Sequence, residues 1–195
     1  WAIIRGERET GITTMFMAEG MDTGDMLLRE TVEIRPEDTA GTLAPRLAGV
    51  GGRLLVETLR RLKAGTLTPE RQDDAQATMA PLLKKEDGLI DWTRPATEIT
   101  NRVRGLSPWP GAYTYVNGER WTLCRVSVGE ESQNAAPGTV TRVTKDRIDV
   151  ATGGGTLQIL DIQPSNSRRM TVAQYLAGHR VTEGVHLQAV PPPQG

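Results

Sequence analysis

The sequence is poor in the residues that build disulfide frameworks and metal centres. It holds one cysteine, Cys124, and two histidines among 195 residues. One thiol cannot form an internal disulfide, and a metal site that needs more than one thiolate from this chain is excluded. The composition suits a reducing compartment, and we expect a cytoplasmic location.

Long apolar runs are also missing. No stretch of about 18 apolar residues occurs, so we expect no transmembrane helix and no membrane partner. The opening residues, WAIIRGERETG, lack the basic region and the longer apolar run of a signal peptide. They do not include an initiator Met. We interpret the chain as a piece of a longer protein.

The charge balance is nearly neutral but uneven along the chain. Charged residues make up 24% and hydrophobic residues 37%, which is typical of a globular protein rather than a disordered one. Residues 1–80 carry 10 Lys/Arg and 13 Asp/Glu, a net of −3, and residues 81–195 carry 13 and 11, a net of +2. The second part is therefore the better candidate to face a polyanion.

Two strands and one long helix are predicted before residue 66. Residues 11–18, GITTMFMA, are rich in β-branched and apolar types, and residues 25–34 nearly alternate. The polar MDTGD between them is predicted to turn. From Thr39 to a natural stop at Gly65, apolar residues recur at helical spacing. These residues are Leu43, Leu47, Val50, Leu54, Leu59 and Leu62.

A second body is predicted to begin near Lys84. Residues 66–83 hold two prolines and no sustained period, which indicates a linker. A short helix over 96–106 is predicted to end at PWPG, and Thr171 could cap a last helix. Asn117-Gly118 favours the positive φ angles of a tight hairpin. Five strand-like runs, at 112–116, 119–128, 137–143, 147–152 and 156–164, predict a small barrel.

Several segments, in order, resemble the methionyl-tRNA formyltransferase family. They are ETGITTMFMAEGMDTGDMLLRETVEI, DTAGTL, KKEDGLIDW, RVRGLSPWPGAYT, GTVTRV and DIQPSNSRRMT. Together they span nearly the whole chain. Each is weak alone, but unrelated chains seldom share such a set in order.

The resemblance implies an α/β protein of two domains. Residues 1–65 would be the end of a Rossmann-like formyltransferase domain, and residues 66–83 the linker. Residues 84–190 would form a small OB-like β-barrel domain that binds tRNA, and residues 191–195 a disordered tail. The family's formyl-folate motif and its catalytic Asn and His have no counterpart here, and neither His179 nor His186 matches them.

The resemblance also implies an activity. The parent enzyme would transfer a formyl group from 10-formyltetrahydrofolate to the α-amino group of methionyl initiator tRNA in translation initiation. It would act as a monomer without a metal. One alternative is a folate-dependent formyltransferase that acts on an amino sugar nucleotide. Another is an inactive fragment that serves only as an RNA-binding module.

Asp22, the first acid of MDTGD, matches the family's catalytic aspartate. Formyl transfer needs proton movement off the attacking amine and stabilisation of an oxyanion. The resemblance implies that Asp22 orients a water and the family's His. Without the resemblance, Asp22 is interpreted as a turn residue between two strands. Asp25 is the second candidate after Asp22, and we interpret it as a turn or capping residue.

The residues just before Asp22 are candidates for the folate site. The resemblance points to Gly20 and Met21 as part of the pocket for the pterin ring. Met15, Phe16 and Met17 are instead expected to pack as a strand against the sheet, because methionine readily fills a core.

Basic residues of the second body are candidates for tRNA contacts. Such contacts neutralise phosphates and make affinity depend on salt. For any one of them alone, a solvated surface position near acids is the favoured interpretation, so the prediction concerns the set as a whole. The candidates are Lys84, Lys85, Arg142, Lys145, Arg147, Arg168 and Arg169.

Overall fold

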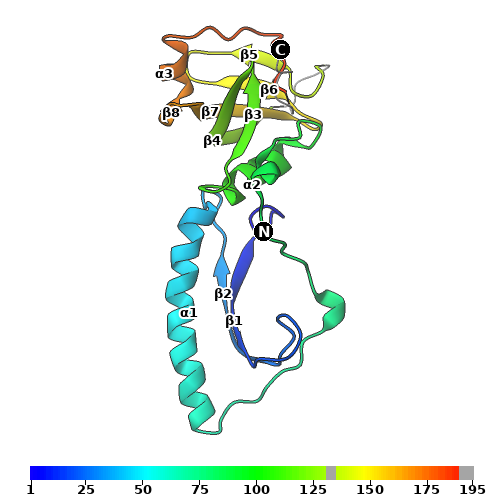
Figure 1. The fold of residues 1–195 in the computed structure, drawn as a ribbon, viewed down its shortest axis with the longest axis vertical. Coiled ribbons are helices and arrows are strands. Elements are labelled where there is room, and N and C mark those ends of the chain that lie inside the picture. Colours follow the sequence, from blue (N-terminus) through cyan, green and yellow to red (C-terminus); the bar gives the residue numbers. More distant parts are fainter. Residues whose placement is uncertain (131–134, 189–195) are drawn as a thin grey trace. The chain divides into compact units, whose positions relative to one another are not determined.

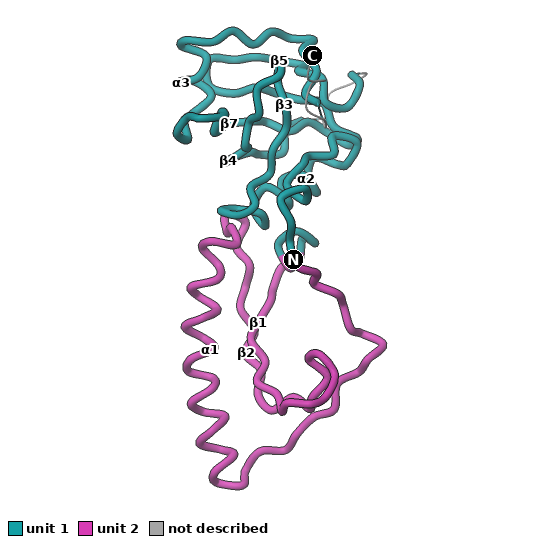
Figure 2. The backbone as a smooth tube through the Cα atoms, in the orientation of Figure 1, with its two compact units in different colours: residues 1, 3–6, 83–195 teal, residues 2, 7–82 magenta. Residues whose placement is uncertain are grey.

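The computed structural model describes residues 1–130 and 135–188. Two compact units divide the chain (Figure 2). The helical unit comprises Ala2 and Glu7–Leu82, and the sheet unit comprises Trp1, Ile3–Gly6 and the described residues from Leu83 onward. The tail predicted to be disordered, residues 191–195, lies outside the described residues.

The helical unit is built on one β-hairpin. Strand β1 spans Glu9–Met15 and pairs antiparallel with β2, which spans Met26–Glu33. Both predicted strands are confirmed in type, but β1 ends at Met15. The residues from 16 to 25 therefore form one long loop.

The predicted long helix is confirmed as α1, Ala40–Lys63, beside the hairpin in Figure 1. Thr39 caps it, since its hydroxyl accepts from the amide of Thr42 and the Thr42 hydroxyl accepts from the amide of Thr39. On the buried face, the hydroxyls of Thr58 and Thr14 are 2.8 Å apart. This bond fixes the helix against β1.

One side of α1 is left without cover in the structure. Leu55, Val56, Leu59 and Leu62 are 51%, 59%, 56% and 43% exposed. A hairpin of two strands is narrow, so it covers only the stripe that includes Val50 and Leu54. Leu59 and Leu62 therefore keep the helical period without entering a core.

The sheet unit contains a six-stranded antiparallel sheet. Its strands follow the order β3-β4-β7-β6-β5, and β8 pairs with β7. Their bounds are β3 Ala112–Val116, β4 Glu119–Gly129, β5 Val140–Val143, β6 Ile148–Ala151, β7 Thr156–Pro164 and β8 Met170–Thr171. Three helices belong to the same unit: the 3-10 helix Lys85–Gly88, α2 Ala96–Gly105 and α3 Val172–Leu176.

The hairpin predicted at Asn117-Gly118 is confirmed. The two residues have φ angles of 49° and 87°, and they join the paired ends of β3 and β4. Positive φ at both positions is the requirement of a type I′ turn, which asparagine and glycine meet at low cost.

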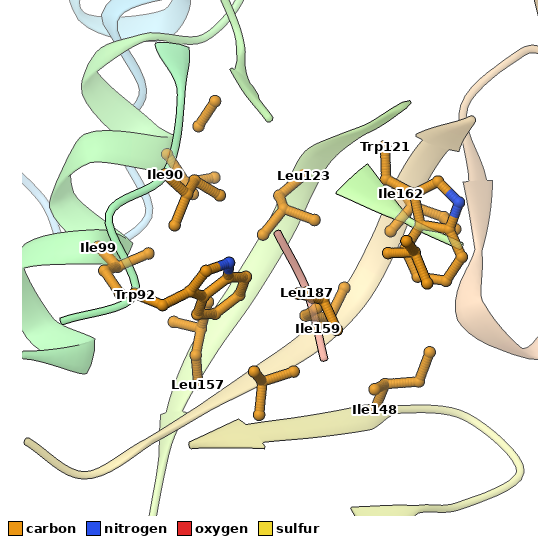
Figure 3. Close-up of a cluster of buried hydrophobic side chains, with 14 of the residues drawn as sticks. Ile90, Trp92, Ile99, Trp121, Leu123, Ile148, Leu157, Ile159, Ile162 and Leu187 are labelled. Atoms are coloured by element: carbon orange, nitrogen blue, oxygen red, sulfur yellow. The ribbon is translucent and has the colours of Figure 1, made fainter. Parts of the chain in front are cut away.

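One apolar core fills the sheet unit (Figure 3). Trp121, Leu157 and Ile159 are at most 1% exposed. Ile99 and Val103 from α2 pack against the same cluster. The four tryptophans of the chain all belong to this unit, so tryptophan fluorescence reports its unfolding.

The predicted closed barrel is not confirmed, because the strand path among the described residues is open between β3 and β5. A late segment partly spans this opening. Gln188 forms a bridge with Tyr115 of β3, and His186 forms one with Thr139 beside β5. The edge strands thus gain hydrogen bonds without a continuous ladder.

Thr114→Val is expected to destabilise the sheet unit. The fully buried Thr114 hydroxyl accepts from the indole N–H of Trp92 at 3.1 Å and donates to the carbonyl of Gln188 at 3.0 Å. Valine keeps the shape but leaves both groups unpaired, at a cost of about 1–3 kcal/mol. Urea unfolding followed by tryptophan fluorescence measures the change.

Thr122→Val is the control, because the half-buried Thr122 hydroxyl makes no hydrogen bond to any residue that the structure describes. Equal stabilities of the two variants would contradict a structural role for the Thr114 hydroxyl.

Candidate functional site

The loop between β1 and β2 carries the predicted catalytic aspartate. The amide of Phe16 donates to the carbonyl of Asp25 at 3.0 Å and closes the loop at its base. A Cβ atom on Gly24 would collide with the carbonyl oxygen of Phe16. The backbone approach at Gly24 therefore requires glycine, which explains the glycine of MDTGD.

Asp22 lies in the turn of this loop with φ of 55°. Aspartate is one of the few non-glycine residues that adopt this left-handed conformation. A single residue in this conformation is kept there by the contacts of the surrounding structure. Its side chain is exposed and belongs to the lining of a hollow of about 670 Å³. The hollow is open to solvent, and a small molecule could reach the carboxylate there.

The structure brings Met21 and Asp22 into the same hollow, together with Thr23. Met21 is 90% exposed, as expected of a side chain with no protein partner to cover it. Gly20 is not part of this lining; a Cβ there would lie 2.6 Å from the hydroxyl oxygen of Thr23. Gly20 thus contributes a close backbone approach rather than a contact surface.

The prediction that Met15, Phe16 and Met17 pack together as a strand is wrong for Phe16 and Met17, which lie beyond the end of β1. The Met17 side chain is 92% exposed, and Phe16 is 39% exposed. The cause is the end of β1 at Met15, after which the chain no longer follows the sheet. Two apolar side chains therefore stand in the loop beside the candidate site.

A contact from residues 70–72 to the loop was not foreseen from the sequence. Glu70 and Met26 exchange two backbone hydrogen bonds of 2.8 Å each. The amide nitrogen of Gln72 lies 2.7 Å from the carbonyl oxygens of both Asp22 and Gly24. Nothing in the segment TLTPERQDDA marks Gln72 in advance, because its partners are carbonyls about 50 residues away.

The basic candidates fall into two groups. Arg147 pairs with Asp149 at 3.0 Å, and Arg169 pairs with Asp161 at 2.7 Å. The remaining five are exposed and make no ion pair with any residue in 1–130 or 135–188: Lys84, Lys85, Arg142, Lys145 and Arg168. Their charges are therefore the ones that face solvent.

Asp161 holds two arginines at once. Arg125 donates to one carboxylate oxygen at 2.8 Å and Arg169 to the other at 2.7 Å. The Arg125 hydrogen bond, aided by that of Arg169, keeps the pKa of the Asp161 carboxyl below its usual range. Burial raises the pKa of the neighbouring Cys124 thiol, which favours its less reactive protonated form.

Neither a metal centre nor a membrane span is found in the part of the chain that the structure describes. No group of three or more His, Cys, Asp or Glu side chains there could hold a metal ion. No described helix is long and apolar enough to cross a bilayer.

Two family models match the chain in the order of its two units. The model described as "Formyl transferase" matches residues 1–59, and "Formyl transferase, C-terminal domain" matches residues 82–180. The chain belongs to the formyl transferase family. The loop with Asp22 lies in the first match, and the basic residues from Lys84 to Arg169 lie in the second.

Curated relatives of this formyl transferase are similar along almost all of the chain. A methionyl-tRNA formyltransferase of Caldanaerobacter subterraneus is 48% identical over 96% of the chain and 60% of the relative. One of Solibacter usitatus is 50% identical over 96% of the chain and 60% of the relative. The chain thus spans about 60% of the length of these relatives.

Solved structures of lower identity share the fold. HypX of Aquifex aeolicus in complex with tetrahydrofolic acid is 23% identical, with a TM-score of 0.62 over 90% of this chain and 31% of HypX. An N-formyltransferase of Helicobacter canadensis, solved with folinic acid and dTDP-3-aminofucose, is 16% identical. Its TM-score is 0.61 over 82% of this chain and 58% of that protein.

Asp161→Asn is expected to weaken the sheet unit at neutral pH and to flatten its loss of stability in acid. The folded carboxyl has a lowered pKa. Its ionised form therefore adds stability above the unfolded pKa of about 3.9, and this contribution is lost as the pH falls through the folded pKa. Urea unfolding at about pH 7 and about pH 3, followed by tryptophan fluorescence, measures it.

Glu183→Gln is the matched control, because the exposed Glu183 makes no ion pair with a described residue. If Asp161→Asn and the unaltered protein lost stability in parallel between the two pH values, the Asp161 carboxylate would contribute nothing.

Proposed function

We propose that this formyl transferase moves a formyl group from 10-formyltetrahydrofolate to the α-amino group of methionyl initiator tRNA. The identity of 45–50% to relatives named methionyl-tRNA formyltransferase, over 93–97% of the chain, carries the proposal. The reaction takes place in the cytoplasm, on a monomeric enzyme, and without a metal.

Each part of the chain has a place in this proposal. Residues 1–65 complete the formyltransferase domain, residues 66–83 form the linker, and residues 84–190 form the tRNA-binding domain. The last is an OB-like barrel in which the segment around His186 and Gln188 stands in for a closing strand. The bridges of this segment to both sheet edges support that assignment.

Asp22 is the catalytic residue of this chain in the proposed reaction. The amine of methionine attacks the formyl carbon as a free base, so protons must leave it while the tetrahedral oxyanion forms. The exposed carboxylate at an open hollow can accept such a proton through a water. The Asn and His implied by the family resemblance would hold the oxyanion and the leaving nitrogen.

The folate binds at the loop before Asp22 in this proposal. Met21 offers an apolar side chain in the hollow, and Gly20 shapes the loop through its close backbone approach to Thr23. When bound, 10-formyltetrahydrofolate supplies the formyl group. The loop binds and orients it.

The charged surface of the sheet unit binds the tRNA backbone. The five unpaired cations, Lys84, Lys85, Arg142, Lys145 and Arg168, carry most of this attraction. Arg147 and Arg169 contribute less, because each is already held by a carboxylate. The amino sugar alternative is less well supported, since the sugar formyltransferases of similar fold are only 16–17% identical.

Asp22→Asn in the intact protein that contains this chain is expected to lower kcat for formyl transfer by about 10²–10⁴-fold, because asparagine cannot accept the proton. Formylation of methionyl-tRNA at saturating folate and tRNA measures the loss. Asp25→Asn is the matched control, since the loop uses the backbone carbonyl of Asp25 rather than its side chain. Turnover of Asp22→Asn equal to that of the unaltered enzyme would remove Asp22 from the mechanism.

Arg168→Gln is expected to weaken tRNA binding more than Arg169→Gln does. Loss of one phosphate contact should lower the slope of log K against log salt by about one. Arg169→Gln should chiefly lower the stability of the sheet unit, because Asp161 loses one of its two partners. Binding titrations over a salt series measure the slopes. A larger change in slope for Arg169→Gln would contradict the division into paired and unpaired cations.

A further inference from the structure

Gln72 reaches the Asp22 loop from a distant part of the chain. Its amide nitrogen is 2.7 Å from the carbonyl oxygen of Asp22 and 2.7 Å from that of Gly24. A primary amide has two N–H groups, so it can donate one to each carbonyl. One side chain thus ties together the two carbonyls on either side of Thr23.

The backbone beside Gln72 is anchored to the same unit. Glu70 and Met26 exchange both backbone hydrogen bonds at 2.8 Å, as neighbours in an antiparallel pair do. The amide of Gln72 also lies 3.8 Å from the sulfur of Met15, at the end of β1. The glutamine is therefore presented to the loop from a fixed base.

The loop needs such a partner at Asp22. The residue has φ of 55°, a left-handed conformation that persists in a non-glycine residue when its surroundings impose it. The bond between Phe16 and Asp25 fixes only the base of the loop. Of the side chains that the structure describes, Gln72 is the one that donates to the carbonyl of Asp22, and that bond restrains the backbone that carries the carboxylate.

We propose that Gln72 is a positioning residue for formyl transfer, which holds the turn that aims the Asp22 carboxylate. It acts through the backbone of Asp22 and not on the substrates. This inference rests on the proposed function, because it assumes the role of Asp22 there. Its physical part, the restraint of the loop by Gln72, can be measured without any assay of activity.

Gln72→Met in the intact protein keeps the length of the side chain and removes both donors. Loss of two hydrogen bonds to the loop should speed amide exchange in residues 16–26 about tenfold or more. A displaced catalytic group should lower kcat by about 10–100-fold, while KM for methionyl-tRNA and for folate stays within about threefold. Hydrogen exchange by mass spectrometry and steady-state kinetics measure the two effects.

Two further variants separate the hydrogen bonds from shape and position. Gln72→Glu keeps the shape but replaces the NH2 group, and with it both donors, with an acceptor oxygen, so it should lower kcat at least as far as Gln72→Met. Gln76→Ala is the control for loop exchange, because the Gln76 amide donates to the carboxylate of Asp73 instead. Exchange in residues 16–26 of that variant should stay as in the unaltered protein.

The outcomes distinguish the inference from the proposed function. Unchanged exchange in Gln72→Met, or faster exchange with unchanged kcat, would overturn the positioning role. Faster exchange that spreads through α1 in both Gln72 variants would make Gln72 a residue of general stability and overturn it too. If the unaltered protein transferred no formyl group to methionyl-tRNA, the proposed function would fail, and exchange would still decide whether Gln72 holds the loop.

Discussion

The candidate site depends on one steric constraint, the close approach of Gly24 to the carbonyl of Phe16. There is no room for a side chain at that point, and the loop can close with the 3.0 Å bond between Phe16 and Asp25 only because residue 24 is glycine. The tight base forces the chain to reverse within a few residues. Asp22 takes the left-handed turn that this reversal needs.

The two units differ in the kinds of buried contact that stabilise them. The sheet unit encloses a core in which Ile148, Val150 and Leu157 are fully buried, so its strands are held mainly by apolar packing. The helical unit has one hairpin, the helix α1 and a 3-10 helix at Asp74–Gln76, and its buried contacts include hydroxyls, such as Thr14 with Thr58. A hydrogen bond between side chains therefore helps to hold α1 in the unit that carries Asp22, beside a smaller set of buried apolar residues.

Local chemistry could be predicted from the sequence, and long-range contacts could not. Thr171 and Asn117-Gly118 act through neighbours within three residues, so the cap of α3 and the hairpin turn were foreseen. The helical spacing of apolar residues predicted α1. It could not predict that Leu59 faces solvent, because the exposure of a side chain depends on how many strands cover the helix. Gln72 escaped prediction for the same reason, since it contacts carbonyls that only the fold brings near.

A basic side chain that already forms an ion pair with a carboxylate attracts a polyanion less strongly than one without such a partner. An arginine that donates to a buried carboxylate has its field largely cancelled at the distance of a second ligand, and moving it to a phosphate would leave the carboxylate uncompensated. The Asp161 side chain is only 11% exposed and pairs with both Arg125 and Arg169. Moving either arginine to a phosphate would therefore cost free energy, because the buried carboxylate would lose a partner. Neighbouring arginines in one dipeptide, Arg168 and Arg169, thus differ in their partners among the described residues, although their sequence positions suggest equivalence. The net charge of +2 on residues 81–195 conceals this difference, which only the partners of each side chain reveal.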